Sequence, residues 1–90
     1  EISMTYAIIV TKSIQKDLDS LPNDIKARVC SKISQLSDNP RPDGVTKLKG
    51  YENEYRIRIG DYRVRYEILD KDKTVLLLQC KHRREVYRND

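Results

Sequence analysis

The pattern of hydrophobic and polar positions predicts a strand near the start of the chain. Residues 6–10 form a short apolar run rich in β-branched side chains, which is typical of a strand. Because the run is apolar on both faces, we expect it to be covered on both sides or to lie centrally in a sheet.

Two helices are predicted next, each by apolar side chains that recur at the spacing of one helical face. The first set is Ile14, Leu18 and Leu21, and the second set is Ile25, Val29, Ile33 and Leu36. Thr11 or Ser13 can cap the first helix, and Pro22 suits the first turn of the second, where its missing N–H would be unsatisfied anyway. Prolines and a glycine within residues 39–44 end the second helix. The tight connection predicts a helical hairpin with one shared apolar face.

The rest of the chain has the alternation of strands. Residues 46–50 predict a short strand or edge segment, and residues 55–59 and 62–68 alternate strictly around a two-residue turn. A polar turn at residues 70–73 precedes a nearly continuous apolar run over residues 74–80, which predicts an interior strand. The predicted class is α+β in the order β-α-α-β-β-β, with the helical hairpin packed on one face of a small, mainly antiparallel sheet.

The two alternating strands place arginines together on one predicted face. Alternate side chains of a strand point to opposite faces, so the apolar set can receive the helices. The other face then carries Arg56, Arg58, Arg63 and Arg65, with Glu67 beside them. Guanidinium groups match phosphate oxygens in pairs, so this face suggests a ligand with many negative oxygens. The alternative is an ordinary solvated face.

Composition and charge narrow the classes of protein. Ninety residues fit one small domain. Charged residues make up 36% of the chain and hydrophobic residues 38%, which is too apolar for a disordered chain and too polar for a membrane protein. Two cysteines indicate cytosolic thiols rather than a disulfide framework, and they do not suffice for a metal site. We expect Met4 to be the natural start, residues 1–3 to be a remnant of cloning, and the protein to be cytoplasmic.

The whole net charge of +4 falls in residues 47–90, which favours a polyanionic partner: nucleic acid or a strongly acidic protein. The alternative is a soluble protein with a high pI.

The end of the chain adds groups that could move a proton or stack on a base. Residues 81–88 follow the last predicted strand and bring His82 and Tyr87 to one end of the sheet. Histidine is the side chain whose ordinary pKa, ~6.5, allows proton transfer near neutral pH. With the arginine face, these residues suggest phosphodiester chemistry without a metal: a base, a charge clamp and a stacking ring. Alone, His82 would be read as a surface histidine and Tyr87 as a packing aromatic.

Three segments together resemble the signature of the RelE/ParE toxin superfamily, the toxins of bacterial and archaeal type II toxin–antitoxin pairs. They are residues 47–50 (KLKG), 55–66 (YRIRIGDYRVRY) and 82–87 (HRREVY). The similarity covers nearly the whole chain from Met4 and implies a single toxin domain over residues 4–90 with the RelE-like microbial RNase fold. It also implies a RelB-like antitoxin as partner, with no membrane and no cofactor.

The resemblance implies cleavage of mRNA in the ribosomal A site, by attack of a ribose 2′-OH on its own phosphate. Family positions fall on Arg56 and Arg58, on Arg63 for the reacting phosphate, and on Tyr87 for the C-terminal tyrosine. A further basic position falls near Lys81, His82 or Arg83. The residues expected to bind RNA or the ribosome are Lys47, Lys49, Arg65, Lys81, Arg83 and Arg84.

This chain departs from the best-known members, which use a lysine as base where it has arginine. Arginine does not give up its proton in proteins. We therefore expect Arg56 and Arg58 to act only as an electrostatic clamp, or the base to have moved. His82 is the first candidate for the base, and Glu67 the second.

Two other functions compete with the ribosome-dependent nuclease. One is a ParE-like toxin that inhibits DNA gyrase by protein contact, and the other is a catalytically silent module that binds nucleic acid. The presence of Arg63, His82 and Tyr87 favours the nuclease, because a pure binder needs charge but no base beside a tyrosine.

Overall fold

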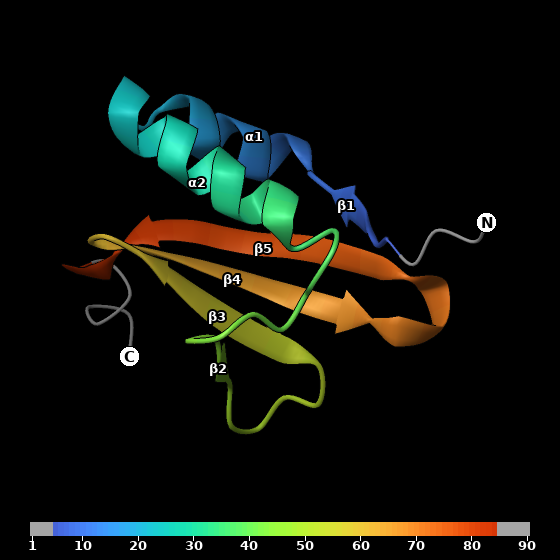
Figure 1. The fold of residues 1–90 in the computed structure, drawn as a ribbon. Helices are drawn as coiled ribbons and strands as arrows, with labels where there is room; N and C mark the ends of the chain where they lie inside the picture. The colour runs from blue at the N-terminus through green and yellow to red at the C-terminus, as the bar shows by residue number, and fades with distance from the viewer. Residues whose placement is uncertain (1–4, 85–90) are drawn as a thin grey trace.

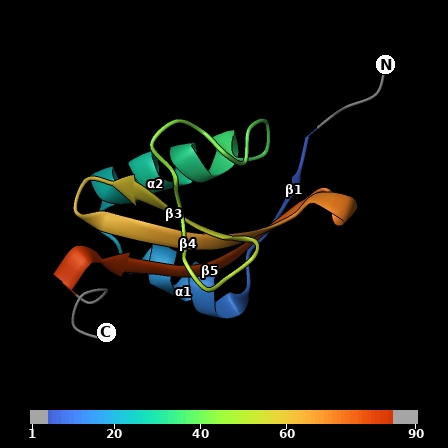
Figure 2. The same ribbon diagram turned by 90° about the horizontal axis from the view of Figure 1, so that it is seen from below.

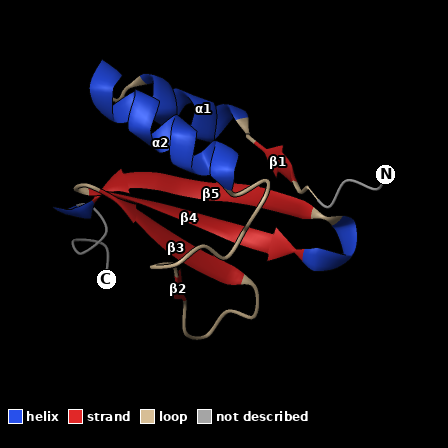
Figure 3. Ribbon diagram, viewed as in Figure 1, coloured by secondary structure: helices blue, strands red, loops and turns tan. Residues whose placement is uncertain are grey.

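Two helices cover one face of a five-stranded sheet in the computed structural model, which describes residues 5–84 (Figure 1). The elements are β1 (Ala7–Ile9), α1 (Lys12–Asp19), α2 (Asn23–Gln35), β2 (Thr46–Lys47), β3 (Glu54–Ile59), β4 (Tyr62–Leu69), the 3₁₀ turn η1 (Asp70–Asp72) and β5 (Thr74–His82). The predicted α+β class and the helical hairpin are confirmed, although four strands follow the hairpin and not the three of the predicted order β-α-α-β-β-β (Figure 3). No helix of the described residues is long and apolar enough to cross a membrane.

The strands lie side by side in the order β1-β5-β4-β3-β2. All neighbours pair antiparallel except β1 and β5, which are parallel. Viewed from below, β3, β4 and β5 lie next to one another, with α1 behind β5 (Figure 2). The last strand is interior, as its apolar run predicted.

The expectation for the first strand was wrong. β1 lies at the edge of the sheet, with β5 as its neighbour, and Ile9 and Val10 are 44% and 41% exposed. The reason is geometric: the strand has three residues and the hairpin leads directly out of it, so helices cover little of its outer side.

The core lies between the helices and the covered face of the sheet. Both helical stripes contribute to it, β3 and β4 contribute every second residue, and the alternation of β5 is interrupted once by a register shift against β4. Its main members are Ile14, Leu18, Val29, Ile33, Leu36, Tyr55, Ile57, Ile59, Val64, Tyr66, Ile68, Val75, Leu77 and Cys80. Thr11 caps α1, because its Oγ1 accepts a hydrogen bond of 3.3 Å from the N–H of Ile14.

Polar contacts fasten the long loop after α2 to the sheet. The hydroxyl of the fully buried Tyr66 donates a hydrogen bond of 2.7 Å to the carbonyl of Pro40. Arg41 contacts both carboxylate oxygens of Asp70, at 2.8 and 3.3 Å, and donates to the Tyr55 hydroxyl at 3.2 Å. These bonds hold the loop that leads into β2 against the far end of β4.

Candidate functional site

The register of three strands brings cationic side chains together on the face that the helices leave open. Arg58 of β3 lies opposite Arg63 of β4, and Arg63 lies opposite Lys81 of β5. We call Arg58, Arg63 and Lys81 the cation row. Directly opposed residues of a sheet have Cβ atoms roughly 4.5–5.5 Å apart, so three like charges lie next to one another. Their neighbours Ile59, Val64 and Cys80 are buried on the other face, which confirms the face predicted for the arginines.

The turn between β3 and β4 orients two members of the cation row. Gly60 has φ +60° at the first central position of the turn, as a two-residue hairpin of type II′ requires. Its carbonyl accepts hydrogen bonds from Arg58 Nε at 3.3 Å and from Arg63 Nη1 at 3.4 Å. Both bonds are long, and Arg58 keeps its two terminal nitrogens for another acceptor. An anion bound here would relieve the repulsion between the two guanidinium groups.

A hollow of about 300 Å³ adjoins the cation row on the side of β2. Its walls are Gly44, Thr46, Arg56, Arg58 and Arg63. Arg56 lies in the next cross-strand row, opposite Arg65 and Thr46. Within residues 5–84 its guanidinium makes no ion pair, so its charge remains available. The hollow therefore presents three guanidinium groups to a ligand, which fits a phosphate group and its neighbouring sugar.

Arg65, the fourth arginine of the open face, forms an ion pair. Arg65 Nε lies 3.2 Å from Glu54 Oε1, and its guanidinium lies 5.8 Å from the centre of the Tyr51 ring. Glu67 shares this end of the face, opposite Glu54. Because Glu67 is four residues from Arg63, about 13 Å separates them along the strand. Glu67 thus lies on the same face as Arg63, two positions farther along it and beyond Arg65.

His82 lies on the other face of the sheet. Its ring meets the edge of Tyr62 with centroids 5.2 Å apart, and Tyr62 packs against the core. The two rings line a hollow of about 200 Å³ together with Asp17 of α1, Leu21 of the connection after α1, and Lys81. A register shift in the pairing of β4 with β5 explains the placement: strict alternation from Val75 and Leu77 would put Lys81 on the helical face, but the shift puts Cys80 and His82 there. The sequence had led us to expect His82 beside the arginines. The structure does not place it there.

The remaining predicted residues are scattered around the site. Lys47 and Lys49 are exposed, and Lys47 lies opposite Tyr55 at the edge of the sheet. Arg83 Nε lies 3.8 Å from Asp61 Oδ1, and the Arg84 N–H donates to His82 Nδ1 at 3.2 Å. Tyr87 lies outside the described residues. Among residues 5–84, no group of three His, Cys, Asp or Glu side chains could hold a metal ion.

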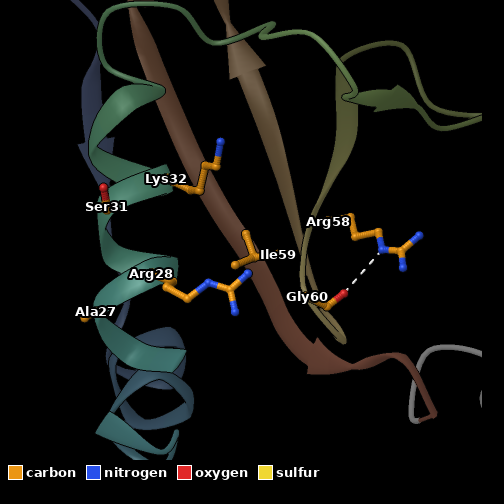
Figure 4. A pocket seen from close by; sticks show the side chains of 7 residues that line it. All are labelled: Ala27, Arg28, Ser31, Lys32, Arg58, Ile59 and Gly60. Carbon is orange, nitrogen blue, oxygen red and sulfur yellow. Dashed lines mark hydrogen bonds between the residues drawn. The ribbon is translucent and has the colours of Figure 1, made fainter. Parts of the chain in front are cut away.

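Sequence reasoning missed two cations on α2. Arg28 and Lys32 line a hollow of about 390 Å³ between that helix and the end of β3 (Figure 4). Their spacing of four residues places them on one helical face, which was the available signal.

Comparisons with known proteins match along most of the chain. A family model described as the ParE toxin of the type II toxin-antitoxin system, parDE, matches residues 8–87. Toxin RelE3 of Methanocaldococcus jannaschii is 31% identical over 86 residues, which cover 89% of this chain and 93% of that toxin. Toxin RelG of Mycobacterium tuberculosis is 33% identical over 86 residues, with coverage of 94% and 99%.

Solved structures also share the fold. A chain in the crystal structure of the archaeal RelE-RelB complex from Pyrococcus horikoshii OT3 has a TM-score of 0.79 and 37% sequence identity. The match covers 88% of the chain described above and 96% of that chain. This chain therefore shares its fold with that chain over most of its length.

Proposed function

Because this chain belongs to the RelE/ParE family of toxins from type II toxin–antitoxin systems, we propose that it acts in the cytoplasm by cleaving mRNA in the ribosomal A site. The observation that carries the proposal is the cation row, together with the adjoining hollow that presents Arg56, Arg58 and Arg63. A face with this charge fits a single RNA strand whose geometry is fixed elsewhere, and the ribosome fixes the codon.

The reaction needs charge where the phosphate becomes more negative. The 2′-oxygen forms a bond to the adjacent phosphorus while the bond from phosphorus to the 5′-oxygen breaks, which leaves a cyclic phosphate and a 5′-OH. Arg63 lies at the centre of the cation row and is placed to stabilise the crowded phosphate. Arg56 and Arg58 hold the flanking oxygens, and Lys81 stabilises charge on the oxygen that leaves. Removal of one such donor typically costs about 10²–10³ in rate.

Proton transfer is the step that the cation row does not supply. Arginine stays protonated, and Lys81 as an ammonium group acts here through its charge. His82 faces the helices against Tyr62, so we assign the 2′-OH proton to a base outside the cation row. A role for the ribosome in that step fits cleavage that depends on it. Tyr87 is proposed to stack on a base of the codon, as the family resemblance implies.

The partner is proposed to be an antitoxin of acidic character. The solved relative from P. horikoshii is a complex of RelE with RelB, and the excess positive charge of residues 47–90 suits an acidic segment. Coexpression with the neighbouring reading frame tests this proposal: a complex should survive purification at low and at high salt. Recovery of the toxin alone under both conditions would contradict it.

A translation extract tests the activity directly. A defined mRNA is translated with the purified toxin, and primer extension maps new 5′ ends. Cuts inside the codon of the A site are expected, and they should vanish when ribosomes are removed. Intact mRNA in the presence of translating ribosomes would contradict the proposal.

Gyrase inhibition is the second candidate, because the family model that matches describes the ParE toxin. A supercoiling assay with purified DNA gyrase separates the two functions. Inhibition of supercoiling together with intact mRNA would favour the ParE-like activity, whereas cleavage of mRNA with normal supercoiling would exclude it.

A further inference from the structure

A second cationic hollow, of about 390 Å³, lies between α2 and the hairpin turn after β3. Arg28 and Lys32 bring two positive charges to it from one face of the helix. Figure 4 shows Arg28 extending from α2 toward the end of β3. Its guanidinium reaches the turn, because a Cβ atom placed on Gly60 would lie 3.6 Å from Arg28 Nη1. The hollow has the size of sites that hold small organic groups, which span roughly 300–1,000 Å³.

The two cations of this hollow are not neutralised by the protein. Within residues 5–84, neither Arg28 nor Lys32 forms an ion pair, whereas Lys26 of the same helix lies 2.8 Å from Asp19. Like charges four residues apart on a helix repel each other. An anion bound between Arg28 and Lys32 would relieve this repulsion.

Arg58 joins this hollow to the open face, because it lines both this hollow and the one of about 300 Å³ beside the cation row. Its Nε donates to the Gly60 carbonyl, which leaves its terminal nitrogens for a ligand. β2 pairs with β3 only as far as Arg56, and no other described strand covers the edge beyond it. A flexible polyanion can therefore pass around this edge from one hollow to the other and remain in contact with cations.

We propose that the hollow beside α2 binds a nucleotide of the mRNA on the 3′ side of the cleaved phosphate. The proposal rests on the proposed function, in which the cation row holds the phosphate that is cleaved. Arg28 and Lys32 bind the phosphate group of the downstream nucleotide, and its base lies on the apolar surface of Ala27 and Ile59. The 3′ side is chosen because the codon on the 5′ side is paired with the tRNA in the P site.

The continuity of the two hollows favours RNA over an acidic peptide. The mRNA occupies Arg58 in the proposed function, so the ligand that continues past this residue is the same strand. Each nucleotide carries one phosphate and one flat base, and the hollow offers cations beside apolar surface. A second point of attachment stops the strand from sliding along the cation row. Orientation of the reacting groups is a large source of catalytic rate, so the second hollow serves to position the cleaved phosphate.

The salt dependence of RNA binding measures the two phosphate contacts without the ribosome. A fluorescein-labelled single-stranded RNA of 12 nucleotides is titrated with the toxin at several salt concentrations. Arg28→Ala/Lys32→Ala should bind about tenfold more weakly than the wild type at low salt. Its slope of log K against log salt should be smaller by about 1.4, because each phosphate contact of a single strand contributes ~0.7.

Lys12→Ala/Lys16→Ala is the matched control for charge. It removes two exposed lysines four residues apart on α1, which do not line the hollow, and should bind RNA as the wild type does. Equal affinities and slopes for the wild type and both double variants would overturn the proposal. A decaglutamate peptide should bind the wild type more weakly than the RNA does. Tighter binding of the peptide, lost in Arg28→Ala/Lys32→Ala, would assign the hollow to an acidic protein and overturn the proposal.

A pair of tryptophan variants tests the hollow itself. Ser31 lines the hollow, so Ser31→Trp fills it and should weaken RNA binding about tenfold. Ser34→Trp, at an exposed serine of the same helix that does not line the hollow, should bind as the wild type does. Since Ser31 is exposed, loss of folding is not expected, and the unfolding midpoint checks this. Equal binding by both variants would contradict a nucleotide in this hollow.

Shortened mRNAs on ribosomes test which nucleotide is bound. The mRNAs end one, two or six nucleotides after the cleaved phosphate, and single-turnover cleavage is measured against toxin concentration. With the wild type, the half-saturating concentration should rise about tenfold when the downstream nucleotides are missing. Arg28→Ala/Lys32→Ala should show this raised value on all three mRNAs, because the variant and the shortening remove the same contact.

The outcomes distinguish this proposal from the proposed function. If the wild type cuts the A-site codon and shortening the mRNA affects both proteins equally, this proposal fails and the proposed function stands. If the wild type cuts no mRNA on ribosomes, the proposed function fails and the downstream nucleotide fails with it. A smaller salt slope of the double variant, together with its insensitivity to shortening, supports both.

Discussion

His82 and Tyr62 meet edge to face on the helical side of the sheet, with 5.2 Å between their ring centroids. The contact places the imidazole beside α1. Its neighbour Lys81 pairs with Arg63 across the sheet and also lines the hollow that contains His82. The chemistry proposed for the RNA phosphate then depends on the cation row and not on the histidine.

The first prediction concerns His82→Gln. The variant should cleave mRNA on ribosomes in single-turnover assays within about threefold of the wild-type rate, because loss of a general base would cost roughly 10²–10⁴. Both proteins should give pH–rate profiles of the same shape between pH ~6 and ~7. A drop of a hundredfold or more, with loss of a rise in rate through this range, would restore His82 as the base.

Lys81→Gln and Lys81→Arg form a matched pair at the end of the cation row. If Lys81 acts by charge, the glutamine variant should lose about 10²–10³ in cleavage rate and the arginine variant should keep most of it. Ribosome binding, measured by co-sedimentation, should remain in both. Equal loss of activity in the two variants would show that the lysine itself, and thus proton transfer, is needed.

Tyr66→Phe tests the fastening of the loop after α2. The buried hydroxyl donates to the Pro40 carbonyl at 2.7 Å, so its removal leaves a buried acceptor without its donor. We expect the free energy of unfolding to fall by about 1–3 kcal/mol in urea denaturation. Tyr51→Phe is the control, because Tyr51 is 50% exposed and should unfold like the wild type. Equal stability of Tyr66→Phe and the wild type would contradict this account.

Asp70→Asn tests the contact between that loop and η1. Hydrogen bonds from Arg41 and from Tyr6 lower the pKa of Asp70 from its ordinary 3.8 to about 2. Between these values the unfolded chain binds more protons than the folded one, so the stabilisation by Asp70 is present above pH ~4 and is lost as the pH falls toward ~2.

Urea denaturation at pH 7 and near pH 2 measures this loss. The wild type should be more stable than Asp70→Asn at pH 7, and the difference should shrink toward zero near pH 2. Asp72→Asn, in the same turn, should show no such difference, since among the described residues Asp72 forms no ion pair. A constant gap between the wild type and Asp70→Asn at both pH values would contradict the assignment.

Much of this fold could be predicted because its periodicities are strong. Each helix has one apolar stripe, around Leu18 and Val29, and the two strands have one apolar face, around Ile57 and Val64. These apolar surfaces are removed from water only when the helices pack on the sheet. The arginine face follows from the same alternation. The edge position of β1 was not predicted, because a short apolar run is compatible with a covered central strand and also with an edge strand.

The placement of His82 was missed for a different reason. The apolar run ends at Cys80, so the predicted strand ended there. The residues after it were not assigned to either face of the sheet. The strand continues through Lys81 and His82, so their side chains alternate. Hydrogen bonding to β4 extends the strand beyond its apolar residues. This extension cannot be predicted from the spacing of apolar residues.

The central claim is that the cation row acts on the RNA phosphate, and Arg63→Ala tests it most directly. Arg63 lies on the open face and its loss creates no cavity in the core, so the variant should keep the wild-type unfolding midpoint. In the translation extract, primer extension should show cuts in the A-site codon with the wild type. With Arg63→Ala the rate should fall about 10²–10³-fold. Cleavage by Arg63→Ala at the wild-type rate would contradict the account.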